Sequence, residues 1–225
     1  MIETKNLTKT FRDGDVETRV LKGIDFKAEN GEFIAIMGRS GAGKSTFLYQ
    51  MSLLDDPTGG EVIVDGRDTH LMTAEEKELF RLMKLGFVFQ DYALLPELTA
   101  RENIALPLLM QNINSTKAYV TATEALSRVR LNHRAHSIPS HLSGGEQQRV
   151  SIARAIAHHP KILFADEPTA NLDNESSGIV LDIFKELHQE GQMIIMVTHE
   201  EQYAKMAEKI IKLDDGKIIS IHKNN

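Results

Sequence analysis

A short glycine-rich segment, Gly38-Arg39-Ser40-Gly41-Ala42-Gly43-Lys44-Ser45, carries residues suited to holding phosphate groups. It matches the phosphate-loop pattern G-x-x-x-x-G-K-[ST] in full. Glycines permit turns that a Cβ atom would block, so successive backbone N–H groups can converge on phosphate oxygens. The pattern predicts that Lys44 reaches the β- and γ-phosphates and that the Ser45 hydroxyl ligates Mg²⁺, while Thr46 offers a hydroxyl near the α-phosphate. The segment therefore predicts nucleotide binding, and by itself it leaves a kinase, a GTPase and an ATPase open.

Two adjacent carboxylates, Asp166 and Glu167, follow a second apolar run at residues 162–165. At the carboxyl end of a strand in an open α/β sheet, such groups lie where phosphates and metal ions bind. We expect Asp166 to hold Mg²⁺, through water, and Glu167 to polarise an attacking water as general base. Together with the phosphate loop, the pair indicates hydrolysis of a nucleoside triphosphate.

The elements that position these groups can be predicted from apolar periodicity. Residues 33–37 form a continuous apolar run before the glycine-rich segment, which is typical of a buried parallel strand. Apolar residues at 47, 48, 51 and 54 then predict a helix that ends at Asp55-Asp56-Pro57. Thr73-Ala74-Glu75-Glu76 is a capping box for a helix to about Lys84.

The rest of the chain alternates in the same way. Residues 1–30 predict antiparallel strands, and the Leu- and Ala-rich stretch from about 94 to 141 predicts a mostly helical insertion. The pattern indicates an α/β fold with a mostly parallel core sheet. The remaining expected elements are strands at 61–65, 162–165, 193–198, 209–213 and 217–221 and a helix at 176–189.

A second candidate anion site is Leu142-Ser143-Gly144-Gly145-Glu146-Gln147-Gln148-Arg149. Ser143 is a capping residue before two glycines and a helix, so backbone amides are presented at a helix N-terminus. The segment resembles the signature sequence of ABC ATPases. That resemblance implies that Ser143, Gly144 and Gly145 of one subunit close over the γ-phosphate held by the phosphate loop of a second subunit. Glu146 departs from the commonest residue there, which is Gln.

Other landmarks of that family occur in order along the chain. Gln90, after the apolar segment 86–89, resembles the Q-loop glutamine that contacts Mg²⁺ and water. Residues 170–173 resemble the D-loop, and His199 resembles the switch histidine that contacts the γ-phosphate. Phe11 lies where the family places an aromatic that stacks on adenine. The resemblance therefore implies a P-loop ABC ATPase that uses ATP and Mg²⁺ and dimerises when ATP is bound.

The resemblance covers nearly the whole chain. It implies one ABC ATPase domain over 1–225, with an N-terminal antiparallel β subdomain and a helical, signature-bearing subdomain inserted at about 94–158. In this family the segment 91–98 after Gln90 forms a groove for a short helix of a membrane subunit. That segment is unusually apolar for a loop, and exposed apolar patches tend to mark partner sites. The alternative is that Leu94, Leu95 and Leu98 pack in the core of the subdomain.

Composition limits the alternatives. The 225 residues are 41% hydrophobic with a net charge of −6, which disfavours nucleic acid as a partner. With no cysteine, disulfides and thiolate zinc sites are excluded. No apolar stretch is long enough to span a bilayer and no signal-peptide core is present, so we expect a cytoplasmic protein held at the membrane by a permease subunit. Four histidines without ligand spacing are expected to be solvated: His133, His136, His158 and His159.

Residues 84–90 and 94–103 resemble the branch that contains lipoprotein-releasing and macrolide- or peptide-export ATPases. The cell-division ABC ATPase, which regulates wall hydrolases through a membrane partner, is similar in the same segments. A soluble ABC ATPase acting on DNA or ribosomes is a third alternative, disfavoured by the acidic charge. We expect an ATPase that drives a separate membrane subunit in export or extrusion, and no residue here identifies the cargo.

Overall fold

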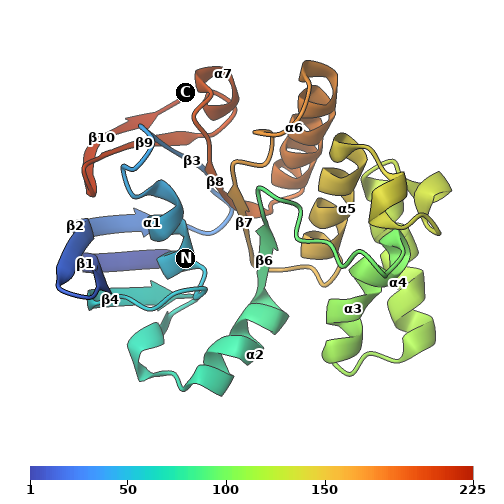
Figure 1. Cartoon of the computed structure of the whole chain (residues 1–225), viewed down its shortest axis with the longest axis horizontal. Helices are drawn as coiled ribbons and strands as arrows, with labels where there is room; N and C mark the ends of the chain where they lie inside the picture. Colours follow the sequence, from blue (N-terminus) through green and yellow to red (C-terminus); the bar gives the residue numbers. More distant parts are fainter. Residues whose placement is uncertain (225) are drawn as a thin grey trace. The chain divides into compact units, whose positions relative to one another are not determined.

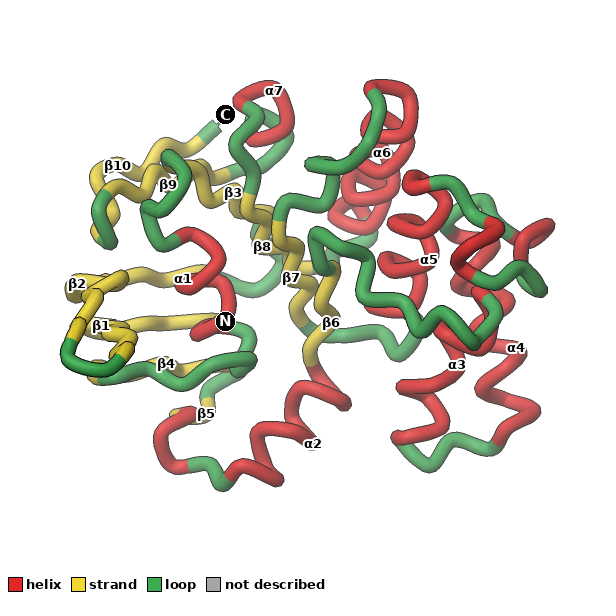
Figure 2. Tube along the Cα trace, viewed as in Figure 1, coloured by secondary structure: helices red, strands yellow, loops and turns green. Residues whose placement is uncertain are grey.

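The structure is a computed structural model and describes residues 1–224. The chain falls into two compact units, one formed by residues 1–79 together with the chain from residue 193 onward, and the other by residues 80–192 (Figures 1 and 2). The first unit is therefore discontinuous in sequence, and the second is a single uninterrupted stretch. The helical segment expected at 94–158 lies inside the second unit.

The first unit begins with an antiparallel sheet in the order β2-β1-β4-β5, as expected for the N-terminal residues (Figure 2). The β1–β2 hairpin turns at Gly14, whose φ of 56° suits glycine. Leu7, Leu21 and Ile24 are fully or almost fully buried along the hairpin, so one face packs against the core. The strands are β1 (Ile2–Asp13), β2 (Val16–Ala28), β4 (Gly59–Val64) and β5 (Arg67–Asp68).

The same unit contains the strand that precedes the phosphate loop, β3 (Phe33–Gly38). It pairs in parallel with β8 (Met193–Val197) on one side and with β9 (Lys209–Asp214) on the other. The edge strand β10 (Lys217–Lys223) runs antiparallel to β9. Residues 33–36 are at most 1% exposed, which confirms the buried parallel strand expected from the apolar run.

Helix α1 (Lys44–Met51) follows the phosphate loop and is shorter than predicted. Ser52 caps it, Leu53 takes a left-handed φ of 61°, and Leu54 is 41% exposed outside the helix. The expectation that Leu54 continues the buried stripe was therefore wrong. The remaining helices of this unit are η1 (Thr69–Leu71) and α7 (Glu201–Ala204), and α2 (Ala74–Lys84) runs across the boundary between the units.

The second unit combines two parallel strands with a cluster of helices. β6 (Leu85–Val88) pairs with β7 (Ile162–Asp166), and α5 packs against β6, α3, α4 and α6 (Figure 2). These elements confirm the mostly helical insertion and the α/β character expected from the sequence. The helices are α3 (Ala100–Met110), α4 (Ser115–Arg128), η2 (Asn132–Arg134), η3 (Pro139–His141), α5 (Gly144–Ile156) and α6 (Asn174–Gln189).

Local capping fixes where the helices begin. Thr73 and Glu76 exchange the two hydrogen bonds of a capping box at α2, as predicted. Thr99 with Glu102 makes a second box at α3, and Ser143 with Glu146 a third at α5. In each case a side chain satisfies an amide that the helix leaves without a partner.

Candidate functional site

The phosphate loop connects β3 to α1, and its first residue packs closely against the backbone of β9. A Cβ atom on Gly38 would lie 2.3 Å from the Leu213 carbonyl oxygen, so only glycine fits there. Gly43 is the N-cap of α1 with a φ of 96°, a left-handed conformation that glycine adopts without strain. Lys44 is 8% exposed, and its Nζ donates to the Arg39 carbonyl at 3.2 Å across the loop. A cationic amine and the first amides of a helix are thus directed at one turn, which suits a phosphate chain.

Two other predicted residues belong to the same unit. Because Thr198 N donates to Ile36 O at 3.1 Å beside the β3–β8 pair, His199 leaves the sheet at the same edge as the phosphate loop. Its ring is exposed, with Nε2 3.5 Å from Glu200 Oε1. Phe11 lies on β1 and is 47% exposed, and the ammonium of Lys9 lies 5.0 Å from its ring centroid. The exposed face of the ring is suited to stacking on a planar base.

The second unit holds the carboxylates and Gln90. Asp166 ends β7 and is 4% exposed, and Glu167 follows it with a φ of 44°. A left-handed Glu is strained, and such residues gather at functional sites. Val88 pairs with Ala165, so the segments after β6 and β7 leave the same edge of this strand pair. There, Asn171 Nδ2 donates to the Gln90 carbonyl at 3.2 Å. The structure thus brings Gln90 close to the segment that carries Asp166 and Glu167.

The signature segment also lies in this unit, at the N-terminus of α5. Ser143 is exposed, and its hydroxyl accepts from Glu146 N at 3.2 Å. Glu146 accepts from Ser143 N at 2.9 Å and pairs with Arg134 Nε at 2.8 Å. Burial raises the pKa of Glu146, but the Ser143 amide and Arg134 outweigh burial and hold that pKa below its usual value. Glu146 therefore stabilises the helix start and leaves the amides of Gly144 and Gly145 for an anion.

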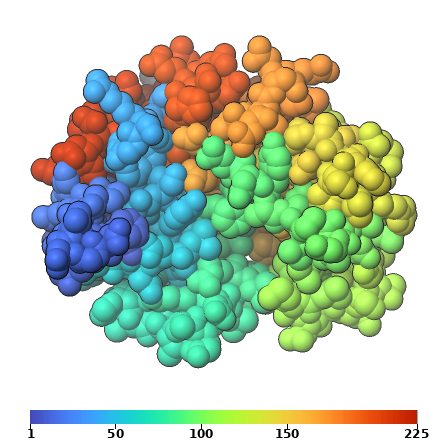
Figure 3. All heavy atoms as spheres, in the orientation of Figure 1, coloured from blue at the N-terminus to red at the C-terminus, as the bar shows by residue number. Residues whose placement is uncertain are grey.

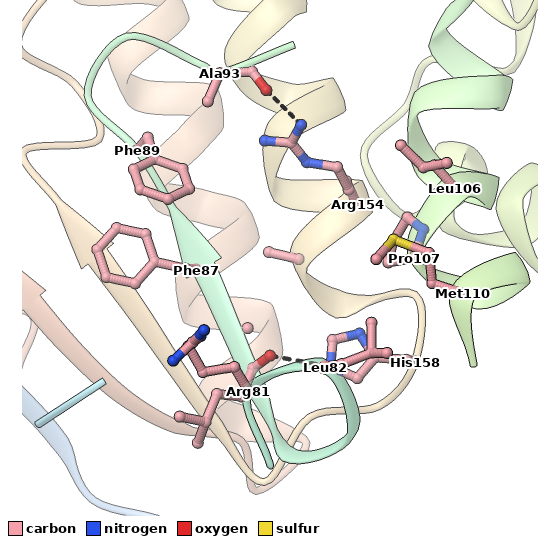
Figure 4. Close-up of a pocket in the computed structure, with 13 residues that line it drawn as sticks. Arg81, Leu82, Phe87, Phe89, Ala93, Leu106, Pro107, Met110, Arg154 and His158 are labelled. Atoms are coloured by element: carbon pink, nitrogen blue, oxygen red, sulfur yellow. Dashed lines mark hydrogen bonds between the residues drawn. The ribbon is translucent and has the colours of Figure 1, made fainter. Parts of the chain in front are cut away.

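A mainly apolar groove of about 280 Å³ opens between β6, α3 and the end of α5 (Figure 4). Its walls are Phe87 and Phe89 on one side and Leu106, Pro107 and Met110 on the other. Of the predicted docking segment 91–98, only Ala93 lines the groove, while Leu95 is 43% exposed. The green part of the chain, to which this segment belongs, forms part of the surface in Figure 3.

The expectation that all four histidines are solvated was wrong for one of them. His158 is half-buried in the groove, with Nε2 3.1 Å from Leu85 O and Nδ1 buried, whereas the other three are exposed (Figure 4). Burial lowers the pKa of His158, so its ring is neutral near pH 7.

The sequence profile described as ABC transporter matches residues 21–170. The chain belongs to the ABC transporter family. Over 98% of its length, it is 49% identical to the uncharacterised ABC transporter ATP-binding protein MJ1508 of Methanocaldococcus jannaschii. The aligned region covers 99% of that protein. The chain is 43% identical, over 96% of its length, to 91% of the lipoprotein-releasing system ATP-binding protein LolD of Shewanella frigidimarina. It is also 44% identical, over 97% of the chain, to 34% of the macrolide export ATP-binding/permease protein MacB of Mannheimia succiniciproducens.

A solved structure agrees with this assignment. The dimeric post-hydrolysis state of the ATP-binding cassette MJ0796, bound to ADP and phosphate, superposes with a TM-score of 0.94 at 39% identity, over 100% of this chain and 99% of that one. The expected ABC ATPase fold and the resemblance to the LolD and MacB branch are confirmed. The chain is the ATP-binding and ATP-hydrolysing part of an ABC transporter. Within residues 1–224, every helix is too short or too polar to cross a lipid bilayer.

Sequence reasoning missed several residues that support the site. Arg134 donates a hydrogen bond to Glu146 and so stabilises the start of the signature helix. Gln148 donates to Phe89 O at 3.4 Å, next to Gln90 in the chain. The pattern S-x-x-E at 143–146 was a usable signal for the capping box. Arg134 and Gln148 give no comparable sequence signal, because their contacts join positions far apart in the chain.

Proposed function

We propose that two copies of this chain bind two ATP molecules with Mg²⁺ in a head-to-tail dimer and drive a separate membrane subunit. The observation that carries this proposal is that one chain has two helix N-termini suited to binding an anion, one at Gly43–Lys44 and the other at Ser143–Gly144. The dimer of the similar cassette MJ0796, bound to ADP and phosphate, supports two-fold assembly around nucleotide. In the proposed dimer, Ser143, Gly144 and Gly145 of one copy contact the γ-phosphate held by the other.

The phosphate chain and base are bound by residues of the first unit in this proposal. Lys44 neutralises the β- and γ-phosphates, and the amides of the loop donate to their oxygens. Ser45 and Thr46 present hydroxyls in the first turn of α1, and Phe11 stacks on the adenine with its exposed face. The contributing loop residues are Gly38, Arg39, Ser40, Gly41, Ala42 and Gly43.

The proposed metal donors are all oxygens: the Ser45 hydroxyl, the Asp166 carboxylate and the Gln90 side-chain carbonyl. This donor set fits Mg²⁺, a hard cation that prefers oxygen ligands and keeps several waters. Bound there, Mg²⁺ would neutralise charge that develops on the phosphates. Asp166 ends β7 and is 4% exposed, so its carboxylate lies at the carboxyl end of a parallel strand, where metal ions bind in open α/β sheets.

Hydrolysis requires a base and a group that senses the γ-phosphate. Glu167 accepts the proton of the attacking water, with Gln90 orienting that water, and its left-handed backbone fixes the carboxylate direction. His199 contacts the γ-phosphate from the edge of β8, beside the phosphate loop. These roles make the three residues the catalytic set.

Replacing Glu167 with Gln tests the proposal. The amide cannot accept a proton, so turnover should fall by about 10²–10⁴-fold while ATP binding persists. The variant should accumulate as a dimer with Mg-ATP in size-exclusion chromatography. Glu186→Gln is the control, because Glu186 forms a surface ion pair with Arg130 at 2.6 Å. Near-normal hydrolysis by Glu167→Gln would remove Glu167 from catalysis.

We propose that the membrane subunit docks a short helix into the groove between β6 and α3, which holds this chain at the cytoplasmic face of the membrane. The groove is mainly apolar, with Arg81 and Arg154 among its lining residues. An apolar helix with an acidic group near its end would complement those cations. The similar LolD and MacB proteins support export or lipoprotein and peptide extrusion as the class of work.

A further inference from the structure

The segment after Gln90 is held in an unfavourable backbone conformation. Tyr92 has a φ of 64° and Ala93 a φ of 48°, although neither is the Gly or Asn that favours this region. Two successive residues keep such a strained backbone only where contacts with the surrounding structure hold them in it. Ala93 N donates to Asp91 O at 2.7 Å, which closes a tight turn within the segment.

Arg154 on α5 satisfies the carbonyls of both strained residues. Its guanidinium donates to Tyr92 O at 3.0 Å and to Ala93 O (Figure 4). A planar guanidinium can bridge two acceptors at once, and a lysine ammonium lacks that fork geometry. Burial lowers the pKa of Arg154, an effect that the Asp91 carboxylate opposes, and Arg stays charged across the biological pH range.

The same segment also touches the other end of α5. A Cβ atom at Gly144 would lie 2.9 Å from the Tyr92 hydroxyl, so the Tyr92 side chain extends to the first residue of the signature helix. Burial raises the pKa of Tyr92, which keeps this hydroxyl protonated. Residues 91–93 are thus joined to α5 near both of its ends, by Arg154 and by Tyr92.

The docking groove shares two of these residues, because Ala93 and Arg154 both line it. A helix seated between Phe87 and Met110 would lie against the contact that holds the strained turn (Figure 4). Any shift of Ala93 changes the direction of the chain three residues after Gln90. It also moves Tyr92 relative to Gly144.

We propose that Arg154 is a positioning residue that fixes residues 91–93, which follow Gln90, to helix α5. A helix docked in the groove would therefore shift Gln90 and Ser143 together. This inference rests on the proposed roles of the groove, Gln90 and Ser143. In this proposal Arg154 acts on the site through the Tyr92 and Ala93 carbonyls to which it donates.

Arg154→Lys tests this contact, and Arg128→Lys is the matched control. Arg128 is also a half-buried arginine on a helix of the same unit, α4, but its guanidinium is hydrogen-bonded to the Glu190 carboxylate, which lies outside the Gln90 segment and the signature segment. Purified proteins are compared for kcat, KM, ATP affinity and melting temperature. Arg154→Lys should lower kcat by about 10- to 100-fold with KM and ATP affinity nearly unchanged, because a misplaced segment impairs chemistry and not binding.

A spectroscopic readout separates positioning from simple loss of stability. The chain has four tyrosines, so 3-fluorotyrosine gives four ¹⁹F signals, and Tyr92→Phe assigns the one from Tyr92. We expect Arg154→Lys to shift or broaden the Tyr92 signal and Arg128→Lys to leave it in place. The inference is overturned if Arg154→Lys only lowers the melting temperature, with kcat well below that temperature and the Tyr92 signal both unchanged.

The link to the groove is tested with a probe of known position. Because the chain has no cysteine, Met110→Cys gives one attachment site in the groove, and Leu109→Cys one on the same helix outside it. Pyrene maleimide at position 110, but not at 109, should move the Tyr92 ¹⁹F signal. Equal spectra from the two labelled proteins would overturn the link. The proposed function fails separately, if Glu167→Gln hydrolyses ATP normally.

Discussion

Three consecutive residues of α3 allow the docking groove to be tested within one turn of helix. Leu108 is 1% exposed, Leu109 is 36% exposed, and Met110 is 62% exposed, and of the three only Met110 lines the groove (Figure 4). A glutamate at each position in turn introduces the same charge at nearly the same place in the chain. The unfavourable interaction of that charge with the C-terminal end of the helix is similar at 109 and 110 and largely cancels in the comparison.

The expected magnitudes follow from burial. Leu108→Glu loses the burial of a full side chain, about 1.5–3 kcal/mol, and adds an unpaired buried charge, so the protein should not fold stably. At Met110 most of the side chain is already in water, so the loss is below about 1 kcal/mol, which shifts the melting temperature by no more than about 4 °C. Binding differs: a docked apolar helix would bury the new carboxylate, at a cost of about 2–3 kcal/mol or roughly 30- to 150-fold in affinity.

Two measurements are made on each variant. Thermal unfolding gives the melting temperature, and purification of the tagged chain in detergent shows whether the membrane protein that co-purifies with the wild type is retained. We expect Met110→Glu to lose that partner, and Leu109→Glu to keep it, with similar melting temperatures and basal ATP turnover for both. A fall of more than about 10 °C for Met110→Glu would show that the side chain is part of the packed core. Retention of the partner by Met110→Glu would exclude the groove as the docking site.

Three further outcomes are expected. Lys44→Ala should abolish ATP binding measured by calorimetry, whereas Ser143→Ala should keep monomer binding and lose dimer formation and turnover; equal loss of binding would contradict the two-site dimer. Glu146→Gln should destabilise the protein by about 1 kcal/mol at pH 7. Because the folded-state pKa of Glu146 lies below its usual 4.5, the difference in unfolding free energy from the wild type, measured by urea titration, should vanish as pH falls through that folded pKa. A difference that does not depend on pH would refute this. Phe11→Ala should weaken ATP binding by roughly 5- to 150-fold with no change in melting temperature, and unchanged affinity would remove the ring from the base site.

Most of the fold was predictable because its signals are local. The buried run before Gly38 and the apolar strand before Asp166 predict their strands directly, since strands buried on both faces have continuous apolar sequences. The end of α1 was predicted too late, because periodicity alone placed Leu54 on the buried face, while the chain reverses at Leu53 with a left-handed φ of 61°.

The support around the candidate site was much less predictable. Arg154 contacts Tyr92 across 62 positions of sequence, and Gln148 contacts Phe89 across 59. Neither contact has a periodicity or a spacing that a sequence pattern could detect. The groove had a partial signal in the apolar segment 91–98, but its walls come from β6 and α3, which only tertiary packing brings together.

The order of strands around β3 has a consequence for how the protein is made. β3 lies between β8 and β9, and Phe33 is hydrogen-bonded to Glu208, which the ribosome adds 175 residues later. The unit of residues 80–192 is contiguous and complete in the nascent chain while the strand before the phosphate loop still lacks both neighbours. Stable capture of ATP therefore has to wait until β8 and β9 have been synthesised, so shorter nascent chains should not bind the nucleotide stably.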